Sequence, residues 1–486
     1  MKHQATNKLI YSLVGFATLS LIPKGSSAAD SHQHDEERPN ILFIMADDLG
    51  WKDVGYMGSQ YYETPNIDRL ADQGMVFTNA YTNAANSAPT RACLISGQYS
   101  PRHGIYTVNN ADRGVDSLRK LMPIRNKTIL DTNVITIAEA LNRKGYVSAS
   151  MGKWHLGDHP THGPESQGFD LNVAGSHWGH PFHGYFSPYY NHALEDGHEG
   201  EYLTDRLTEE AVRFIENNQY QPFFLYLPYY SVHTPLQAKE QETEKFRQKE
   251  TWNGHNNPVY AAMIHSVDRG VGRLMNTLRK LDLKKETLVI FYSDNGGLGG
   301  YKENGIVHRD ITSQAPLRGG KGMFYEGGIR VPLVVRWPGK IEAGSECETP
   351  VISLDFYPTL LDVAGINKQD DKVLDGKSML PLLKQEGNFE REALYWHFPA
   401  YLQGNEGTFR TRPVGVIRSG NYKLMEFFED GRLELYNLEE DIGEKNDLSE
   451  EMPDKTRELH QKLKDWRQDI GAPVPQKKNP LYYEFN

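Results

Sequence analysis

Continuous apolar runs that alternate with amphipathic helical patterns constrain the fold of this chain more than any other feature. The run 41–45 (Ile-Leu-Phe-Ile-Met) contains only apolar residues, as expected for a strand that is buried on both faces. Similar strands are predicted at 146–151, 223–230, 288–292 and 331–335. This alternation predicts an α/β fold in which a large, mostly parallel central sheet is sandwiched by helices.

Helical signals separate these runs. Thr64 begins a series of apolar positions with helical spacing, and Thr136 forms a capping box with Glu139 at the start of another helix. The same spacing of apolar residues predicts longer helices over 204–217 and 259–281. These segments would supply the layers that cover the sheet.

The pattern changes after about residue 365. A mostly polar segment at 367–375 is predicted to be a linker, and a helix is predicted over 453–469. Between them, turn signals separate short strand patterns at 392–396, 414–418, 423–427 and 433–437. We therefore predict a main domain over 38–375 and a smaller α+β domain over 376–486, built on an antiparallel sheet.

The N-terminus has the pattern of an export signal. Its start is basic, the run 9–23 is mostly apolar but short for a membrane span, and small residues stand at 27–29. We predict a signal peptide over 1–29 and a disordered lead-in over 30–37. The mature protein would then be exported, periplasmic or secreted, with no integral membrane segment. An anchoring helix is the alternative, although no stop-transfer pattern follows.

The charge balance limits the classes of partner. The 486 residues carry a formal net charge of -11, which disfavours nucleic-acid binding because that function requires a basic face. An anionic substrate is still compatible, since a local cluster of Lys, Arg and metal overrides the net sign. Of the two cysteines, Cys93 and Cys347, we expect Cys93 to be a buried free thiol.

Polar residues follow the predicted buried strands. Asp47 and Asp48 follow the first strand, and Asp294 and Asn295 follow the strand at 288–292. The carboxyl ends of parallel strands meet at one edge of a sheet, so these side chains are expected to converge. Their oxygens suit Ca²⁺ or Mg²⁺, and zinc is less suited without a thiolate or a necessary imidazole. Taken alone, the pair Asp47-Asp48 is also typical of a turn or a helix cap, and the pair Asp294-Asn295 of a turn.

Further cationic and imidazole groups follow other strands. Lys153 and His155 occupy alternate positions after one strand, so they would face the same ligand. His233 follows another strand, and Lys321 lies in a glycine-containing segment that permits close backbone approach. The structural alternatives are an exposed lysine and a hydrogen-bonded histidine.

Ser87, Pro89 and Arg91 stand in the segment Ser-Ala-Pro-Thr-Arg, at the expected start of a helix. This segment resembles the activation motif of type I sulfatases, in its serine form, within the alkaline phosphatase superfamily. Motifs similar to those of the family continue through the chain, with Gly-Lys-Trp-His-Leu-Gly, His-Thr-Pro and Ser-Asp-Asn-Gly at 152–157, 233–235 and 293–296. They extend to 321–332 and to Leu-Tyr-Asn-Leu-Glu-Glu-Asp at 435–441.

The resemblance implies an activated residue and a cation. Ser87 would be oxidised to Cα-formylglycine by a serine-competent maturase. Its hydrate would attack the sulfur of a sulfate ester, and Arg91 would hold this nucleophile in place. The family most often uses Ca²⁺, with Mg²⁺ less expected here. The ligands implied for this cation are Asp47, Asp48, Ser87, Asp294 and Asn295.

The resemblance also implies roles for four other residues. Lys153 and Lys321 would bind sulfate oxygens. His233 would protonate the departing alcohol oxygen. His155 would deprotonate the second hydroxyl of the hydrate, so that sulfate leaves and the aldehyde is regenerated.

The expected activity is therefore that of an exported sulfatase acting on a sulfated carbohydrate. Trp178 could stack on a sugar, with His177 and His180 near its hydroxyls or a second acidic group, although a second metal site or a packed loop is an equal alternative. His308, Arg309 and Arg318 are candidates for contacts with an anionic polymer, and Arg412 would close the far side of the cleft. We favour an algal galactan or ulvan over a glycosaminoglycan. The alternatives are a phosphoesterase or phosphonate hydrolase of the same superfamily, and an unactivated glycan-binding protein.

Overall fold

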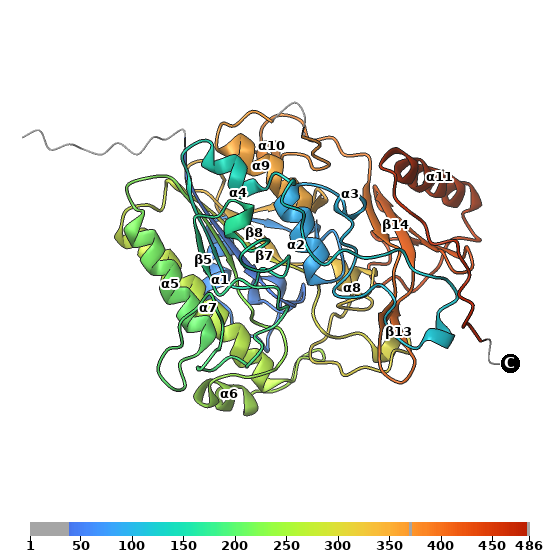
Figure 1. Cartoon of the computed structure of the whole chain (residues 1–486), viewed down its shortest axis with the longest axis horizontal. Helices are drawn as coiled ribbons and strands as arrows, with labels where there is room; N and C mark the ends of the chain where they lie inside the picture. Colours follow the sequence, from blue (N-terminus) through green and yellow to red (C-terminus); the bar gives the residue numbers. More distant parts are fainter. Residues whose placement is uncertain (1–37, 369–371, 484–486) are drawn as a thin grey trace, which may run out of the picture. The chain divides into compact units, whose positions relative to one another are not determined.

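An eight-stranded sheet forms the centre of the fold (Figure 1). The computed structural model describes residues 38–368 and 372–483, so the predicted signal peptide and lead-in, and part of the predicted linker, lie outside the described residues. The strands lie in the order β5 (Leu171–Val173), β4 (Val147–Met151), β6 (Phe223–Pro228), β1 (Asn40–Ala46), β7 (Thr287–Ser293), β8 (Leu333–Arg336), β2 (Met75–Phe77) and β9 (Ser345–Cys347).

The sheet is mostly parallel, as predicted. Strands β5, β4, β6, β1 and β7 run in one direction, with Ile44 level with Leu227 on one side and Phe291 on the other. Strand β8 runs antiparallel to β7. The connection between β7 and β8 contains only short helical turns. It therefore lacks the crossover helix that usually joins a parallel pair.

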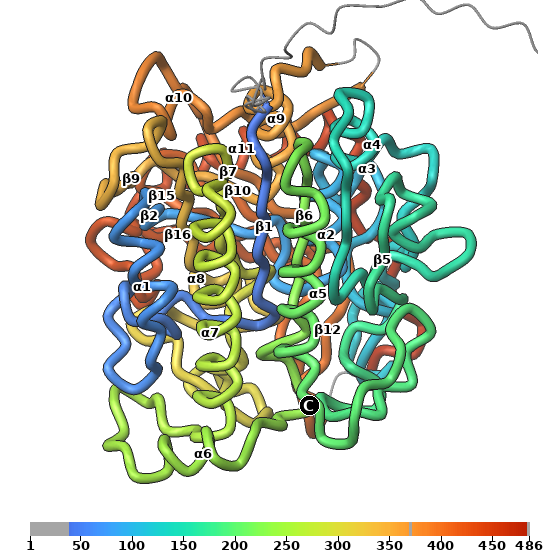
Figure 2. Tube along the Cα trace, turned by 90° about the vertical axis from the view of Figure 1, so that its left-hand side faces the viewer, coloured from blue at the N-terminus to red at the C-terminus, as the bar shows by residue number. Residues whose placement is uncertain are grey.

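Strand β1 supplies side chains to both faces of the sheet. Leu42 and Ile44 belong to one hydrophobic core, and Ile41 and Phe43 belong to the other. The first face is covered by α1 (Pro65–Asp72), α5 (Leu203–Asn217) and α7 (Pro258–Lys280); Figure 2 shows α5 and α7 side by side. The second face is covered by α2 (Ser87–Ser96), α4 (Ile137–Asn142) and α9 (Phe356–Val363).

The predicted helix starts differ in their capping. The backbone N–H of Glu139 donates to Thr136 Oγ1 at 3.2 Å, and the backbone N–H of Thr136 donates to Glu139 Oε2 at 2.6 Å, which confirms the capping box. Thr64 precedes α1, but its side chain makes no capping bond to the helix backbone. Its hydroxyl instead accepts from the backbone of Gly55 at 2.7 Å and donates to Asp68 at 2.9 Å.

The C-terminal part forms a four-stranded antiparallel sheet, as predicted. Its order is β11 (Leu394–Phe398), β14 (Val414–Ser419), β15 (Tyr422–Phe427) and β16 (Leu433–Asn437), and α11 (Pro453–Asp469) packs against it. Trp396 of this sheet shares a core with Tyr81 of the main part, with ring centroids 5.6 Å apart. A domain boundary near residue 375 stays a prediction.

Shorter elements complete the fold. Two small pairs join β3 (Ala80–Tyr81) to β10 (Val351–Ile352) and β12 (Leu402–Gln403) to β13 (Phe409–Thr411). The remaining helices are α3 (Ser100–His103), α6 (Glu240–Arg247), α8 (Glu326–Ile329) and α10 (Leu380–Lys384), with short 3-10 turns at Gly55–Met57, Asp116–Leu118, Glu165–Gln167, Lys302–Asn304 and Ser353–Asp355.

Two further observations concern the described residues. Cys93 is a buried free thiol, as predicted, and Cys347 is also free and buried. Within residues 38–368 and 372–483, no helix combines the length and the apolar character needed to cross a bilayer.

Candidate active site

Ser87 stands at the first position of α2, against the carboxyl ends of β1 and β7. Its side chain is buried, and its Oγ lies 3.2 Å from Asp47 Oδ1 and 3.5 Å from Asn295 Oδ1. Lys153 Nζ donates to the same Oγ at 2.9 Å. A serine hydroxyl is thus held between an ammonium group and a cluster of oxygen ligands.

Three carboxylates form this cluster. Asp47, Asp48 and Asp294 each place an oxygen within 4.8 Å of the others, and all three are fully buried. Burial, followed by the charge of Asp294, raises the pKa of Asp47 to about 8. Asn295 donates its amide to Asp48 Oδ1 at 2.8 Å, and its own oxygen faces Ser87. Buried oxygen ligands that repel one another fit a hard divalent cation such as Ca²⁺ or Mg²⁺.

Two lysines contact the cluster from different sides. Lys153 Nζ lies 2.6 Å from Asp47 Oδ2, and Lys321 Nζ lies 2.7 Å from Asp48 Oδ2. Burial opposes ionisation of Asp48, but the positive charge of Lys321, with a smaller effect of Lys153, holds its pKa well below the usual range. Burial lowers the pKa of Lys153, against the opposing charge of Asp47. Each ammonium group therefore contacts a different carboxyl group of the cluster.

Arg91 lies one helical turn after Ser87 and contacts a different partner from the one expected. Its Nε and Nη2 both donate to Asp294 Oδ2, at 3.1 Å and 2.8 Å, and its Nη1 donates to the carbonyl of Lys153 at 2.6 Å. The guanidinium therefore orients a carboxylate of the cluster and fixes the backbone that carries Lys153. It does not act on residue 87 through a direct hydrogen bond.

Two histidines complete the floor of the site. His233 Nδ1 lies 2.6 Å from the carbonyl of Thr234, so this nitrogen carries the proton, and Nε2 lies 3.7 Å from Asp48 Oδ2. Burial, followed by the charge of Lys321, lowers the pKa of His233 to about 3. Burial and then Lys153 lower the pKa of His155 well below its usual value. His155 Nδ1 is buried without a hydrogen-bond partner among the described residues. Both rings are therefore neutral in the free site.

A cavity of about 750 Å³ opens above this floor. No Asp or Glu occurs among its lining residues, within the described part of the chain. Several residues singled out from the sequence do line it, namely Ser87, His155, His177, Trp178, His180, His233, His308, Arg309 and Lys321. Tertiary structure therefore brings together residues that are more than 200 positions apart in sequence.

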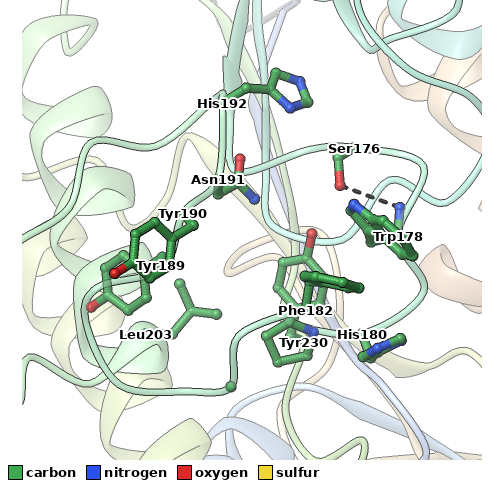
Figure 3. Close-up of a pocket in the computed structure, with 12 residues that line it drawn as sticks. Ser176, Trp178, His180, Phe182, Tyr189, Tyr190, Asn191, His192, Leu203 and Tyr230 are labelled. Atoms are coloured by element: carbon green, nitrogen blue, oxygen red, sulfur yellow. Dashed lines mark hydrogen bonds between the residues drawn. The ribbon is translucent and has the colours of Figure 1, made fainter.

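One wall of the cavity is aromatic and continues into a neighbouring pocket (Figure 3). The ring centroid of Trp178 lies 4.3 Å from that of Phe182, and these side chains are 39% and 55% exposed. The backbone N–H of Trp178 donates to Ser176 Oγ, drawn as a dashed line in Figure 3, and His177 Nδ1 lies 2.5 Å from Asp158 Oδ2. The ring of His180 stacks with that of His233 at 6.3 Å. These contacts fix the loop that carries the exposed rings.

Two arginines expected at the substrate lie elsewhere. Arg318 donates to the hydroxyl of Tyr436 at 3.0 Å and to the carbonyl of Glu444 at 2.9 Å, so it joins the two parts of the fold. Arg412 pairs with Glu429 at 2.8 Å. Neither of them lines the cavity, because both guanidinium groups are engaged by the surrounding structure.

Two arginines of the cavity were not predicted from the sequence. Arg113 and Arg410 line the same cavity as the aromatic residues, and both are partly buried. Arg113 lies in an irregular segment without a motif. Arg410 lies within the short strand β13, two positions before Arg412, in a segment for which no strand was predicted. Strand β13 pairs with β12, and Leu402 of β12 lines the same cavity as Arg410.

Two family models and several known proteins match this chain. The sulfatase family model matches residues 39–366, and the model for the C-terminal region of N-sulphoglucosamine sulphohydrolase matches residues 320–469. A protein of Formosa agariphila named sulfatase is 33% identical, with 95% of this chain and 94% of that protein covered. The N-acetylgalactosamine-6-sulfatase of Rattus norvegicus is 32% identical, with 74% of this chain and 68% of that protein covered.

A solved structure extends this similarity to three dimensions. The crystal structure of Ps i-CgsB in complex with k-i-k-neocarrahexaose has a TM-score of 0.73 and 32% sequence identity. The match covers 90% of this chain and 95% of that chain. Both the large sheet and the C-terminal part therefore have counterparts in a single known structure.

Proposed function

This chain belongs to the sulfatase family and is a sulfuric ester hydrolase, and on that basis we propose that it removes sulfate from a sulfated algal galactan or its oligosaccharides at the Ser87 site. The observation that carries the proposal is the position of Ser87 Oγ, which lies between Lys153 Nζ and the buried carboxylates on the floor of the cavity. The choice of a galactan is supported by the similarity to Ps i-CgsB, whose solved complex contains k-i-k-neocarrahexaose. Exposed rings such as Trp178 suit the apolar faces of sugars.

Two groups would complete the site. Oxidation of Ser87 by a serine-competent maturase would supply Cα-formylglycine, an aldehyde whose hydrate carries two hydroxyl groups on one carbon. A divalent cation, Ca²⁺ rather than Mg²⁺, would supply Lewis-acid stabilisation of negative charge. The residues that would hold it are Asp47, Asp48, Asp294, Asn295 and the modified residue 87.

The lysines would bind the sulfate group. Lys321 lines the cavity and Lys153 lies at Ser87, so their ammonium groups flank the position of the sulfate that is cleaved. Positioned donors of this kind stabilise the charge that develops on the sulfate oxygens. Arg91 would act as a positioning residue, because it orients Asp294 and the backbone of Lys153.

The histidines would move protons at defined atoms. The carbonyl of Thr234 fixes Nδ1 of His233 as a donor, which leaves Nε2 to give a proton to the departing alcohol oxygen. The negative charge of a bound sulfate ester favours protonation of this ring. His155 is neutral in the free site and would accept the proton that is released when sulfate leaves.

Location and domain organisation are part of the proposal. We expect the chain to be exported, periplasmic or secreted, with its catalytic domain at 38–375 and the smaller domain at 376–486. The second domain would contribute to the cavity through Leu402 and Arg410.

The test is mass analysis combined with product analysis. Trypsin releases residues 70–91 as one peptide, because no Lys or Arg precedes Arg91 within it. In enzyme from its native host, this peptide should have lost two hydrogens, and Ser87→Ala should abolish turnover. Sulfate release should be seen from galactan oligosaccharides across a panel of defined sulfated sugars. An unmodified Ser87 in active enzyme, or release of phosphate in preference to sulfate, would overturn the proposal.

A further inference from the structure

The cavity has a cationic wall that the proposed chemistry does not use. Arg113, Arg309, Arg410 and His308 belong to it, beside Lys321 of the proposed sulfate site. Lys321 pairs with Asp48, but among the described residues none of the three guanidinium groups has a carboxylate at ion-pair distance. Arginines that face a cavity without an acidic partner are typical of sites that bind anions.

Arg410 is held rigidly on this wall. Its guanidinium lies 5.2 Å above the ring of Tyr301, and its Nη2 lies 2.7 Å from His308 Nε2. Gly322 packs closely beside it, since a Cβ added there would lie 2.5 Å from Leu402 Cδ2 and 3.0 Å from Arg410 Cδ. The hydroxyl of Tyr301 donates to the carbonyl of Lys321 at 2.8 Å. The position of Arg410 is therefore tied to that of Lys321 at the catalytic floor.

Several donors on this wall are unsatisfied. Arg410 Nε is buried and makes no hydrogen bond within the described part of the chain, and His308 Nδ1 is buried with only the side chain of Asn405 beside it. His308 Nε2 accepts from Arg410, so its Nδ1 carries a proton and is a donor. Arg113 is close enough to Arg410 for the two positive charges to repel. Buried donors and like charges are costly unless a ligand supplies acceptors and negative charge.

We propose that Arg113, His308 and Arg410 form a second anion subsite, which binds a sulfate group of the substrate other than the one that is removed. The inference rests on the proposed function and narrows its substrate class to glycans with at least two sulfate groups. Arg410 packs on Tyr301, which donates to the backbone of Lys321, so the second sulfate would bind close to the one that is cleaved, and we place it on the neighbouring sugar. The enzyme would then desulfate densely sulfated chains before sparsely sulfated ones.

The test compares two oligosaccharides that have the same sugars and the same cleavable sulfate, with and without a sulfate on the neighbouring sugar. The wild-type enzyme should have a higher kcat/KM for the disulfated form. Arg410→Gln and Arg113→Gln remove the charge and shorten the side chain, but keep an unbranched stem with a polar end. Each should lower the ratio of the two kcat/KM values by about 10- to 100-fold, as expected for hydrogen bonds to charged groups.

A neighbouring arginine provides a matched control. Arg412→Ala removes a charge two positions from Arg410 but outside the cavity, and should leave the ratio as in wild type. Thermal melts of both glutamine variants show whether folding is kept. An unchanged ratio in folded Arg410→Gln and Arg113→Gln, or a wild-type enzyme that does not distinguish the two substrates, would overturn the second subsite. If the wild-type enzyme cleaves a small aryl sulfate but neither oligosaccharide, the proposed carbohydrate substrate is overturned instead.

Discussion

The ammonium nitrogen of Lys153 lies 2.6 Å from Asp47 Oδ2, and both side chains are fully buried. The same nitrogen donates to Ser87 Oγ. This one side chain therefore connects the carboxylate cluster to the residue that begins α2. Its removal should affect both the stability of the fold and the reaction.

We expect Lys153→Met to lower the free energy of unfolding by about 1–3 kcal/mol, because the buried oxygens of Asp47 and Ser87 would lose their hydrogen-bond donor. Turnover of a small aryl sulfate should fall about 100- to 1000-fold, since a donor to the developing charge is lost. Urea unfolding and steady-state kinetics measure the two effects. Lys340→Met removes an exposed lysine and is the matched control. Wild-type turnover in Lys153→Met would contradict the assigned role.

Removal of divalent cations should abolish turnover and lower the melting temperature. Without a cation, Asp47, Asp48 and Asp294 repel one another in a buried site. A cation at 100 times its Kd should stabilise the fold by about 2.7 kcal/mol. Chelation followed by addition of Ca²⁺ or Mg²⁺ tests this, with Ca²⁺ expected to restore more activity. Addition of either ion should restore little activity to the Asp294→Asn variant. Full activity after chelation would exclude a required cation.

Trp178→Ala should raise KM for an oligosaccharide by about 3- to 10-fold, because an exposed ring that stacks on a sugar is lost. The value of kcat should change less than KM. Steady-state kinetics with oligosaccharide and aryl sulfate separate the two parameters. Tyr220→Ala removes another exposed ring, outside the cavity, as a control. Equal changes in KM for both variants would show that Trp178 has no particular part in binding.

Arg318→Ala should act on stability rather than on substrate choice. It removes hydrogen bonds to Asn304, Tyr436 and Glu444, so the free energy of unfolding should fall by about 2–4 kcal/mol. Oligosaccharide and aryl sulfate turnover should decline to the same degree. Chemical unfolding measures the first effect, with the exposed Arg125→Ala as control. A loss of turnover on the oligosaccharide alone would show that Arg318 contributes to the substrate site.

The pH dependence of stability should contain a contribution from His103. Burial, with a smaller effect of Lys127, lowers the pKa of this histidine from 6.5 to about 3, and its Nε2 lies 3.4 Å from Cys93 Sγ. Between these pKa values the unfolded chain binds a proton that the native protein does not bind. The free energy of unfolding should therefore fall as pH falls, by up to about 1.4 kcal/mol per pH unit from this residue.

The matched variant for this effect is His103→Gln, whose side chain is neutral at every pH. Urea unfolding of both proteins between about pH 5 and 7 should show a shallower dependence for the variant. Parallel curves for the two proteins would show that His103 is not buried in its neutral form.

Local patterns in the sequence predicted most of the secondary structure. The apolar run that became β1 and the helix at 453–469 were identified closely, because burial periodicity and helix starts depend on neighbouring residues. The convergence of Asp47, Asp48 and Asp294 was also predicted, since the carboxyl ends of parallel strands share one edge. The antiparallel direction of β8 was not foreseen, because strand direction depends on the whole connection that precedes it.

The sequence by itself determined the α/β class, the family and the residues that gather around Ser87. Tertiary structure alone decided which arginines face the substrate cavity. Arg410 and Arg412 differ by two positions, yet the first lines the cavity and the second pairs with Glu429. The physical reason is that a long charged side chain takes its partner from whichever segments pack beside it. Those segments, such as the Lys321 loop and β13, are remote in sequence and are brought together only by folding.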